Sequence, residues 1–343
     1  MAFKTVAVGK SEGRKSDVDY DALNAYVVEN AGLEQAEVIP GIIAAIVDLG
    51  IQEQEDAQVA FKGDADDEAA EIEKNPGTYF VDGVDPQNPK VLTRLKCWPQ
   101  RPQQSVAFAV DFPSIQLDKG QFFGDDSGET KPLRLWLGGS FFIKDVGMVV
   151  GRPTPLRIKK NTAGKWSFDK KHLCYKMAAA AKLVDAAKDG VFLPQDIDKL
   201  LGKAFNFEAQ IYYKTSKGKD YYTENVKFVS GLPRGTPIPE YDLTPFVVEF
   251  DGPNKEENLK QLRNHITNTI KRASNYEGSA LATELENLYN SKSEDGDTDG
   301  DEQDVPEPED TPPVRTTKAA AAPKKTKAKP VKEADDSDDD APF

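Results

Sequence analysis

The hydrophobic pattern along the chain predicts a strand-rich body with helical segments before, within and after it. The clearest strand is the apolar run IIAAIVDL at 42–49, which lies between two glycines and is too short for a typical helix. Helical spacing is clearest where Leu259, Leu262, Ile266 and Ile270 recur every three or four positions. We expect further strands at 78–81, 91–98, 105–112, 133–142, 205–214 and 220–229, and helices at 16–30, 172–188, 196–201, 254–272 and 277–289.

The order of these elements predicts a mainly β fold with peripheral helices. The helix at 172–188 falls between the third and fourth long strands, as in a five-stranded OB-fold Greek-key barrel. The glycine pair in LRLWLGGSFF at 133–142 is typical of a sharply bent barrel strand. A β-sandwich has a similar number of strands and is the alternative. The expected parts are an N-terminal extension with a short helix at 1–35, the barrel at 36–236 with an acidic insert at 52–75, and a C-terminal helical extension at 237–290.

The segment from residue 291 to residue 343 has the composition of a disordered chain. Leu, Ile, Val and Phe occur there only as Val305, Val314, Val331 and Phe343. So little apolar surface cannot offset the conformational entropy that is lost when a chain is ordered. We expect a disordered linker at 291–332, followed by an acidic tip at 333–343 that reads EADDSDDDAPF.

The formal net charge of −14 is unevenly distributed along the chain. Residues 1–90 carry a net charge of −12, residues 91–290 carry +6, and residues 291–343 carry −8. Between Lys131 and Arg234 there are 20 basic and 9 acidic residues. An acidic protein with such a basic segment is expected to bind a polyanion through that segment.

The sequence offers little for catalysis, so we expect a protein that is not an enzyme and that binds no cofactor or metal. The two histidines are His172 and His265, and the pair His172 and Cys174 lacks the second ligand pair of a structural zinc site. The glycine-rich loops that cradle nucleotide phosphates are absent from the sequence. The aspartates that follow Ser293 resemble an EF-hand loop, but Pro306 stands where its final glutamate is required.

Cysteine usage and hydropathy favour a cytoplasmic protein. Two cysteines, Cys97 and Cys174, do not make a disulfide framework in a chain of 343 residues, which indicates a reducing compartment. The first residues lack the continuous apolar core of a signal peptide. The most apolar run, at 38–51, is too short to span a bilayer and contains Asp48, so we expect no membrane partner.

Basic and aromatic residues are interleaved in two parts of the body, which is typical of proteins that bind single-stranded nucleic acid. Lysines neutralise phosphates, and flat rings stack on unpaired bases. Adjacent tyrosines on a strand point to opposite faces, so one of each pair is expected in the core. Trp136 lies in the most apolar strand and is also expected in the core. The candidate strand-binding residues are Trp98, Arg152, Arg157, Lys159, Lys160, Lys165, Trp166, Phe168, Lys170, Lys171, Tyr212, Tyr213, Lys214, Lys217, Lys219, Tyr221 and Tyr222.

The last six residues, DDDAPF, resemble the acidic tip of bacterial and phage single-stranded DNA-binding proteins, which typically end in aspartates followed by Pro-Phe. In that family the tip docks on replication and repair partners, which here would be a polymerase, helicase, primase or recombinase of phage or host. A terminal ring can fill an apolar pocket while the carboxylates meet a basic rim. The resemblance assigns partner binding to Asp338, Asp339, Asp340, Pro342 and Phe343.

The body carries a second resemblance to the phage single-stranded DNA-binding proteins. Residues 196–235 resemble their last two barrel strands, and IIAAIVDLGIQ at 42–52 resembles the first. The resemblance implies an OB-fold over residues 36–236 that binds single-stranded DNA without sequence specificity. It would protect the strand and remove its secondary structure during phage DNA replication or recombination. The matching residues in the later segment are LLGK at 200–203, KGK at 217–219, Tyr221, and LP at 232–233.

Two other functions are compatible with the same composition. An acidic chaperone or DNA mimic would bind proteins and show no affinity for single strands. A metal-dependent nuclease would use the acidic clusters and cleave the strand when Mg²⁺ is added. The acidic insert after Gln52 and the long linker also depart from the usual pattern of the DNA-binding family.

We predict that deletion of residues 333–343 leaves single-stranded DNA binding as tight as in the full chain, or tighter. The aspartates of the tip carry the same charge as phosphates and compete with them for basic residues. Filter binding at fixed salt measures the effect, and removal of Phe343 alone is the control that lowers partner binding while sparing DNA binding. Weaker DNA binding after the deletion would contradict the prediction.

Overall fold

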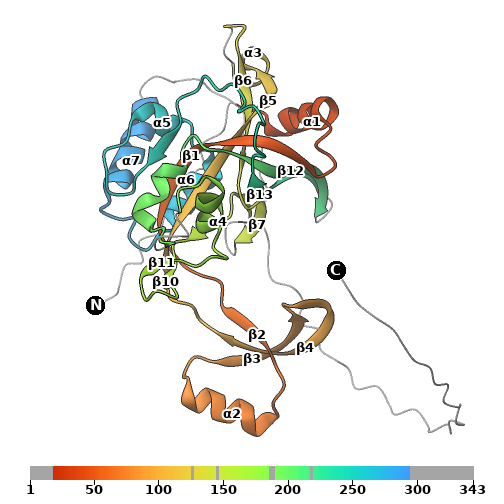
Figure 1. The fold of residues 1–343 in the computed structure, drawn as a ribbon, viewed down its shortest axis with the longest axis vertical. Helices are drawn as coiled ribbons and strands as arrows, with labels where there is room; N and C mark the ends of the chain where they lie inside the picture. The colour runs from red at the N-terminus through yellow and green to blue at the C-terminus, as the bar shows by residue number, and fades with distance from the viewer. Residues whose placement is uncertain (1–17, 125–126, 144–146, 185–189, 217–218, 294–343) are drawn as a thin grey trace, which may run out of the picture. The chain divides into compact units, whose positions relative to one another are not determined.

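The computed structural model describes residues 18–124, 127–143, 147–184, 190–216 and 219–293 (Figure 1). The fold is mixed and mainly β, with antiparallel sheets and peripheral helices, as the sequence pattern predicts. The acidic tip and all but the first three residues of the predicted linker lie outside the described residues. No helix in the described part of the chain combines the length and the hydropathy needed to cross a membrane.

Five long strands form the main path of the largest sheet, in the order β13-β12-β1-β5-β6. Neighbours on this path are antiparallel. Two short strands extend the sheet, because β14 pairs with β1 in parallel and β9 pairs with β5 in antiparallel orientation. The strands are β1 (Glu37–Gln52), β5 (Gln103–Asp118), β6 (Thr130–Trp136), β9 (Thr154–Pro155), β12 (Ala204–Ser216), β13 (Lys219–Gly231) and β14 (Phe246–Val248).

The two ends of this path, β6 and β13, do not form a ladder with each other among the described residues, so no closed barrel is present there. The chain beyond β6 nevertheless reaches β13. The backbone N–H of Gly138 donates a hydrogen bond to the carbonyl oxygen of Val226 at 2.9 Å. The first and last strands of the path are therefore close in space.

Strand β1 is buried on both faces, which explains why its sequence is apolar at successive positions. On one face Ile43 and Ile46 join a core that includes Phe108. On the other face Ala45 and Val47 join a second core. The sheet therefore separates two apolar layers.

The second core lies between the sheet and the C-terminal helices, which Figure 1 shows at one side of the sheet. The predicted apolar positions Leu259, Leu262, Ile266 and Ile270 are all buried in it. The expected single helix at 254–272 is wrong in detail, because the chain turns after Lys260 and a second helix starts at Asn264. The helices are α5 (Glu256–Lys260), α6 (Asn264–Lys271) and α7 (Ala280–Ser293).

Two helices on the first core differ from what the sequence predicts. The helix expected at 172–188 ends at Ala180, and Lys182 then has a φ of 59°, in the left-handed region that an α-helix cannot use. The segment expected as a helix at 196–201 is a 3₁₀ helix. The elements are α1 (Tyr20–Ala31), α3 (Lys119–Phe123), α4 (Leu173–Ala180) and η1 (Pro194–Leu200).

A separate three-stranded sheet is inserted between β1 and β5, and we call residues 57–98 the arm (Figure 1). The strands expected at 78–81 and 91–98 belong to the arm and not to the main sheet. Its helix packs through ion pairs, since Glu68 binds Arg94 at 2.7 Å and Glu71 binds Lys96. The arm contains β2 (Ala57–Phe61), α2 (Ala65–Lys74), β3 (Tyr79–Asp85) and β4 (Asn88–Trp98), with β4 in the middle of the sheet.

The strand expected at 133–142 is interrupted at its glycine pair. Gly138 and Gly139 have φ values of 95° and 66°, which suit glycine and end β6 instead of bending it. The residues after the pair belong to a separate two-stranded sheet. That sheet contains β7 (Ser140–Ile143) and β8 (Gly147–Val150), and another two-stranded sheet contains β10 (Ile158–Lys160) and β11 (Trp166–Phe168).

A buried ion pair joins α6 to both ends of the main sheet. The carboxylate of Glu224, on β13, accepts a hydrogen bond from Arg263, with Arg263 Nη1 3.1 Å from Glu224 Oε2. It also accepts one from the backbone N–H of Trp136 at 3.2 Å. Arg263 also donates through Nη2 to the carbonyl oxygen of Arg134 at 2.6 Å. The carboxylate and the guanidinium together bridge β6, β13 and the residue that precedes α6.

A second buried carboxylate holds the segment that follows β13. Asp111 of β5 accepts two hydrogen bonds from Arg134, at 2.7 and 3.0 Å, and one from the hydroxyl of Tyr241 at 2.9 Å. Burial and the neighbouring Asp111 carboxylate raise the pKa of Tyr241, so its hydroxyl stays protonated and keeps donating. The buried carboxylates of Asp111 and Glu224 thus each help to fasten the C-terminal extension to the sheet.

We predict that Arg263→Met lowers the free energy of unfolding by about 3–5 kcal/mol, because it leaves the Glu224 carboxylate buried without its partner. Lys227→Met is the matched control. Lys227 lies on β13, the strand that carries Glu224, and pairs with Glu208 near the surface. Its loss should change stability by no more than about 1 kcal/mol. Urea unfolding measures both variants, and equal small effects would contradict the bridging role of Arg263.

Candidate nucleic-acid interface

The first group of candidate residues lies on the hairpin formed by β10 and β11, which we call the basic hairpin (residues 158–168). Its turn is set by Asn161, whose side-chain oxygen accepts hydrogen bonds from the backbone N–H groups of Ala163 and Lys165, at 2.9 and 3.0 Å. Gly164 completes the turn with a φ of 75°. The turn brings Lys160 directly opposite Trp166.

Trp166 is the exposed ring of the basic hairpin. Its side chain is 54% exposed, and the Nζ atom of Lys160 lies 5.8 Å from the ring centroid. Lys159, on the same strand, forms an ion pair with Asp169 at 2.5 Å and lowers the pKa of that carboxyl. The hairpin therefore presents a flat ring beside one cation, Lys160, while the neighbouring Lys159 points to the other face of the strand and already has a carboxylate partner.

Phe168 does not belong to this exposed surface. The sequence places it among the strand-binding residues, but its ring is only 2% exposed and lies in the first core. It stacks on His172, with centroids 4.4 Å apart and an interplanar angle of 20°. A ring that is packed in the core is not available to stack on a base.

His172 has a structural role at this place. Its Nδ1 accepts a hydrogen bond from the backbone N–H of Cys174 at 3.2 Å, and its Nε2 lies 2.8 Å from the carbonyl oxygen of Pro155. Burial lowers the pKa of the imidazole, which favours a neutral ring that accepts at Nδ1 and donates at Nε2. In the described residues no group of three His, Cys, Asp or Glu side chains is placed to hold a metal ion.

Arg152 and Arg157 lie beside the chain segment that leads into the arm, and we call residues 53–56 the arm root. The main sheet positions the segment that carries the two arginines, because β9 pairs with β5 and the backbone N–H of Leu156 donates to the carbonyl oxygen of Gln104 at 2.8 Å. Arg152 binds the Glu55 carboxylate at 2.9 Å, and Arg157 binds the side-chain oxygen of Gln54 at 3.3 Å. Neither arm-root residue is among the sequence-predicted site residues.

Four further candidates are also exposed near these elements. Trp98 ends β4, and the Nζ atom of Lys96 lies 5.9 Å from its ring centroid. Lys170 and Lys171 are exposed just after the basic hairpin, and the backbone N–H of Lys171 donates to Asp169 at 2.8 Å. Lys165, in the hairpin turn, is exposed as well.

The tyrosine candidates lie in a different part of the sheet. β12 runs antiparallel to β1 with Ala209 opposite Glu37, so its later residues extend beyond the start of β1, whereas the arm root follows the end of β1. Tyr213 is exposed and contacts Tyr222 edge-on at 4.2 Å. Tyr212 and Tyr222 are half-buried, and Tyr222 packs against the first core, whereas Tyr212 is not part of that core. The side chains of Lys214, Lys219 and Tyr221, and all of Lys217, lie outside the described residues.

The candidates therefore form two groups at opposite ends of β1 and not one continuous groove. The outward face of β5 and β6 between them is covered, because Ala107, Ala109 and Trp136 lie in the core beneath the C-terminal helices. Trp136 is buried as expected, and its ring contacts His265 edge-on. A strand that contacts both groups has to pass around the C-terminal helices.

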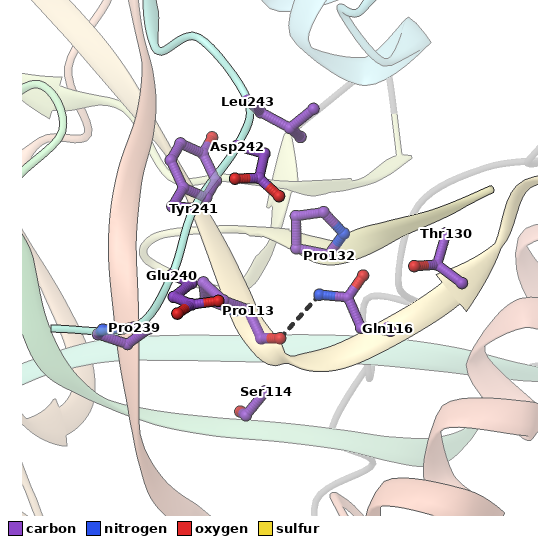
Figure 2. Close-up of a pocket in the computed structure, with 10 residues that line it drawn as sticks. All are labelled: Pro113, Ser114, Gln116, Thr130, Pro132, Pro239, Glu240, Tyr241, Asp242 and Leu243. Atoms are coloured by element: carbon purple, nitrogen blue, oxygen red, sulfur yellow. Dashed lines mark hydrogen bonds between the residues drawn. The ribbon is translucent and has the colours of Figure 1, made fainter. Parts of the chain in front are cut away.

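A hollow of about 460 Å³ opens beside β5 and β6, and Figure 2 shows its lining. The side-chain amide of Gln116 donates to the carbonyl oxygen of Pro113 at its floor, at 2.8 Å. Glu240 and Asp242 supply two carboxylates, and no lining residue is basic. This hollow repels phosphates and is not part of the candidate interface.

Comparisons with known proteins add no assignment to this geometry. A scan against models of protein families found no match, and searches of curated proteins and of solved structures found none either. The function has to be argued from the residues themselves.

We predict opposite outcomes for two substitutions two positions apart on β11. Phe168→Ala should lower the free energy of unfolding by about 3–5 kcal/mol, because it leaves a cavity in the first core. Trp166→Ala should change it by no more than about 0.5 kcal/mol, because the ring is exposed. Urea unfolding of both variants tests the assignment, and a large effect of Trp166→Ala would contradict it.

Proposed function

We propose that the protein binds single-stranded DNA without sequence specificity and is not an enzyme. The observation that carries the proposal is the exposed Trp166 ring beside Lys160 on the basic hairpin, where Lys159, Lys165, Lys170 and Lys171 are further exposed lysines. A flat ring offers a stacking surface to any base, and the lysines offer charge to the flanking phosphates. Neither contact reads a base edge, so binding of this kind is independent of sequence.

We further propose that the main sheet is an OB-type barrel. The strand order supports this, because an OB barrel laid open between its third and fifth strands has the order 5-4-1-2-3. With β1, β5, β6, β12 and β13 as strands one to five, the path β13-β12-β1-β5-β6 has that order. The position of α4 between β6 and β12 also supports the proposal, as does the Gly138–Val226 hydrogen bond between the two ends.

In this interpretation the arm occupies the connection between the first and second barrel strands, and residues 217–218 form the connection between the fourth and fifth. These two connections flank the ligand in OB-folds. Both groups of candidate residues then lie at ligand-flanking positions. The proposed strand contacts are made at the arm root and basic hairpin on one side and by Tyr213 on the other.

The proposed cellular role follows from the resemblance of the sequence. Bound strand would be protected and kept free of hairpins during phage DNA replication or recombination in the host cytoplasm. The tip that ends in Pro342 and Phe343 would recruit replication proteins, with Asp338, Asp339 and Asp340 meeting a basic rim on the partner. No membrane takes part in this proposal.

The test is a titration with a homopolymeric single strand, followed by tryptophan fluorescence at several salt concentrations. Affinity should fall steeply with salt, and the duplex control should bind more weakly. Trp166→Ala should weaken binding at least about fivefold, since stacking of one base contributes about 1–3 kcal/mol. Buried Trp136 should not respond to the strand.

Other outcomes favour the other functions. Absence of binding would support a DNA mimic or chaperone, and cleavage of the strand with Mg²⁺ would support a nuclease. Equal affinity of the wild type and of Trp166→Ala would remove the basic hairpin from the interface.

A further inference from the structure

Two of the candidate arginines are already engaged by side chains of the arm root. Arg152 and Glu55 are 97 residues apart in the chain, yet Nη2 and Oε2 lie 2.9 Å apart. Arg157 and Gln54 repeat this arrangement at 3.3 Å. Two adjacent arm-root residues therefore meet two arginines of one segment.

The arm root is held in place for these contacts by its own hydrogen bonds. The amide of Gln54 donates to the carbonyl oxygen of Gln52 at 2.9 Å, which fixes the direction of its side chain. The amide of Gln100, on the chain segment that leaves the arm, donates to the carbonyl oxygen of Glu55 at 2.7 Å. The two connections of the arm are thus tied together next to Arg152.

The two arginines are bound as they would be in a phosphate site, but protein side chains take the place of the phosphate. A guanidinium binds carboxylate and phosphate oxygens with the same planar donor geometry. The Glu55 carboxylate and the Gln54 amide oxygen are oxygen acceptors placed where phosphate oxygens would bind. The side chains of Glu55 and Arg152 are 76% and 55% exposed, so water and ions reach the contact and it can exchange.

We propose that Arg152 and Arg157 form a phosphodiester-binding subsite at the arm root, and that Glu55 and Gln54 occupy it until a nucleic-acid strand displaces them. The subsite deepens the proposed function and rests on it. The strand exchanges one oxygen acceptor for another, so the arm root lowers affinity for every sequence equally. Salt dependence is also reduced, because the released Glu55 carboxylate takes up a cation when the strand binds.

The test compares Glu55→Gln with Glu53→Gln in the full chain. Both substitutions remove one negative charge from the arm root and keep the shape of the side chain. Glu53 is exposed, and its side chain forms no ion pair with any residue that the structure describes. Glu55→Gln should raise single-strand affinity about two- to fivefold at low salt and steepen the slope of log affinity against log salt by about 0.7. Glu53→Gln should give a much smaller change in both quantities.

A double-mutant cycle places the effect at the arginine. In an Arg152→Gln background, Glu55→Gln should give no further gain in affinity, because the partner that it releases is absent. Equal gains from Glu55→Gln and Glu53→Gln would overturn the subsite, since net charge alone would then explain both. An undiminished gain in the Arg152→Gln background would overturn it as well.

Inorganic polyphosphate separates this proposal from the proposed function, because it offers phosphates without bases. Suppose that the wild type binds neither single-stranded nor duplex DNA, but that Glu55→Gln still binds polyphosphate more tightly than Glu53→Gln. The proposed function then fails and the phosphate subsite stands. If DNA binds but the two variants match with both ligands, the subsite fails and the proposed function stands.

Discussion

The buried carboxylate of Glu224 is the contact on which the arrangement of the main sheet depends. β6 and β13 end the strand path, and their facing edges would leave backbone groups without partners. Glu224 satisfies one of these groups, the backbone N–H of Trp136, and Arg263 satisfies another, the carbonyl oxygen of Arg134. Because Arg263 precedes α6, the same contact that holds the edges together also fixes the C-terminal helices on the sheet.

This fastening determines where a ligand can bind. The helices fill the outward face of β5 and β6 with the second core, in which Ala107 and Ala109 lie beneath larger side chains. Exposed rings and cations remain at the margins of the sheet, on the basic hairpin, at the end of the arm and on the β12–β13 hairpin. The interface proposed for DNA is therefore a set of flanking contacts and not a groove across the middle strands.

The sequence predicted element types well where burial is uniform along an element. The run at 42–49 is apolar at every position but one because β1 is buried on both faces, and the helical spacing from Leu259 to Ile270 follows the second core. The sequence predicted less where the assignment of a strand to its sheet depends on partners that are distant in the chain. Strands at 78–81 and 91–98 have the composition of strands, but no local pattern shows that they pair only with each other and with β2.

The candidate site shows the same division. The exposure of Trp166 and the burial of Trp136 follow from the apolar support that each has in the sequence, but Phe168 stands in a similar basic context and is buried. Its partners His172 and Phe192 come from later segments that the local sequence does not place. The contact between Arg152 and Glu55 has no local sequence signal, because the two residues lie 97 positions apart.

Ion pairing also changes what the charge count means. The 20 basic residues between Lys131 and Arg234 suggested a large reserve of phosphate contacts. Within that range Arg134 is committed to Asp111 in the interior, while Lys159 and Arg152 already have carboxylate partners at the surface. A cation that must release a carboxylate before it binds phosphate contributes less affinity and less salt dependence than a free one. In the proposed interface, strand affinity would therefore be set by the few cations that are exposed and readily released, and the arm root, which carries the Glu55 partner of Arg152, would adjust their number.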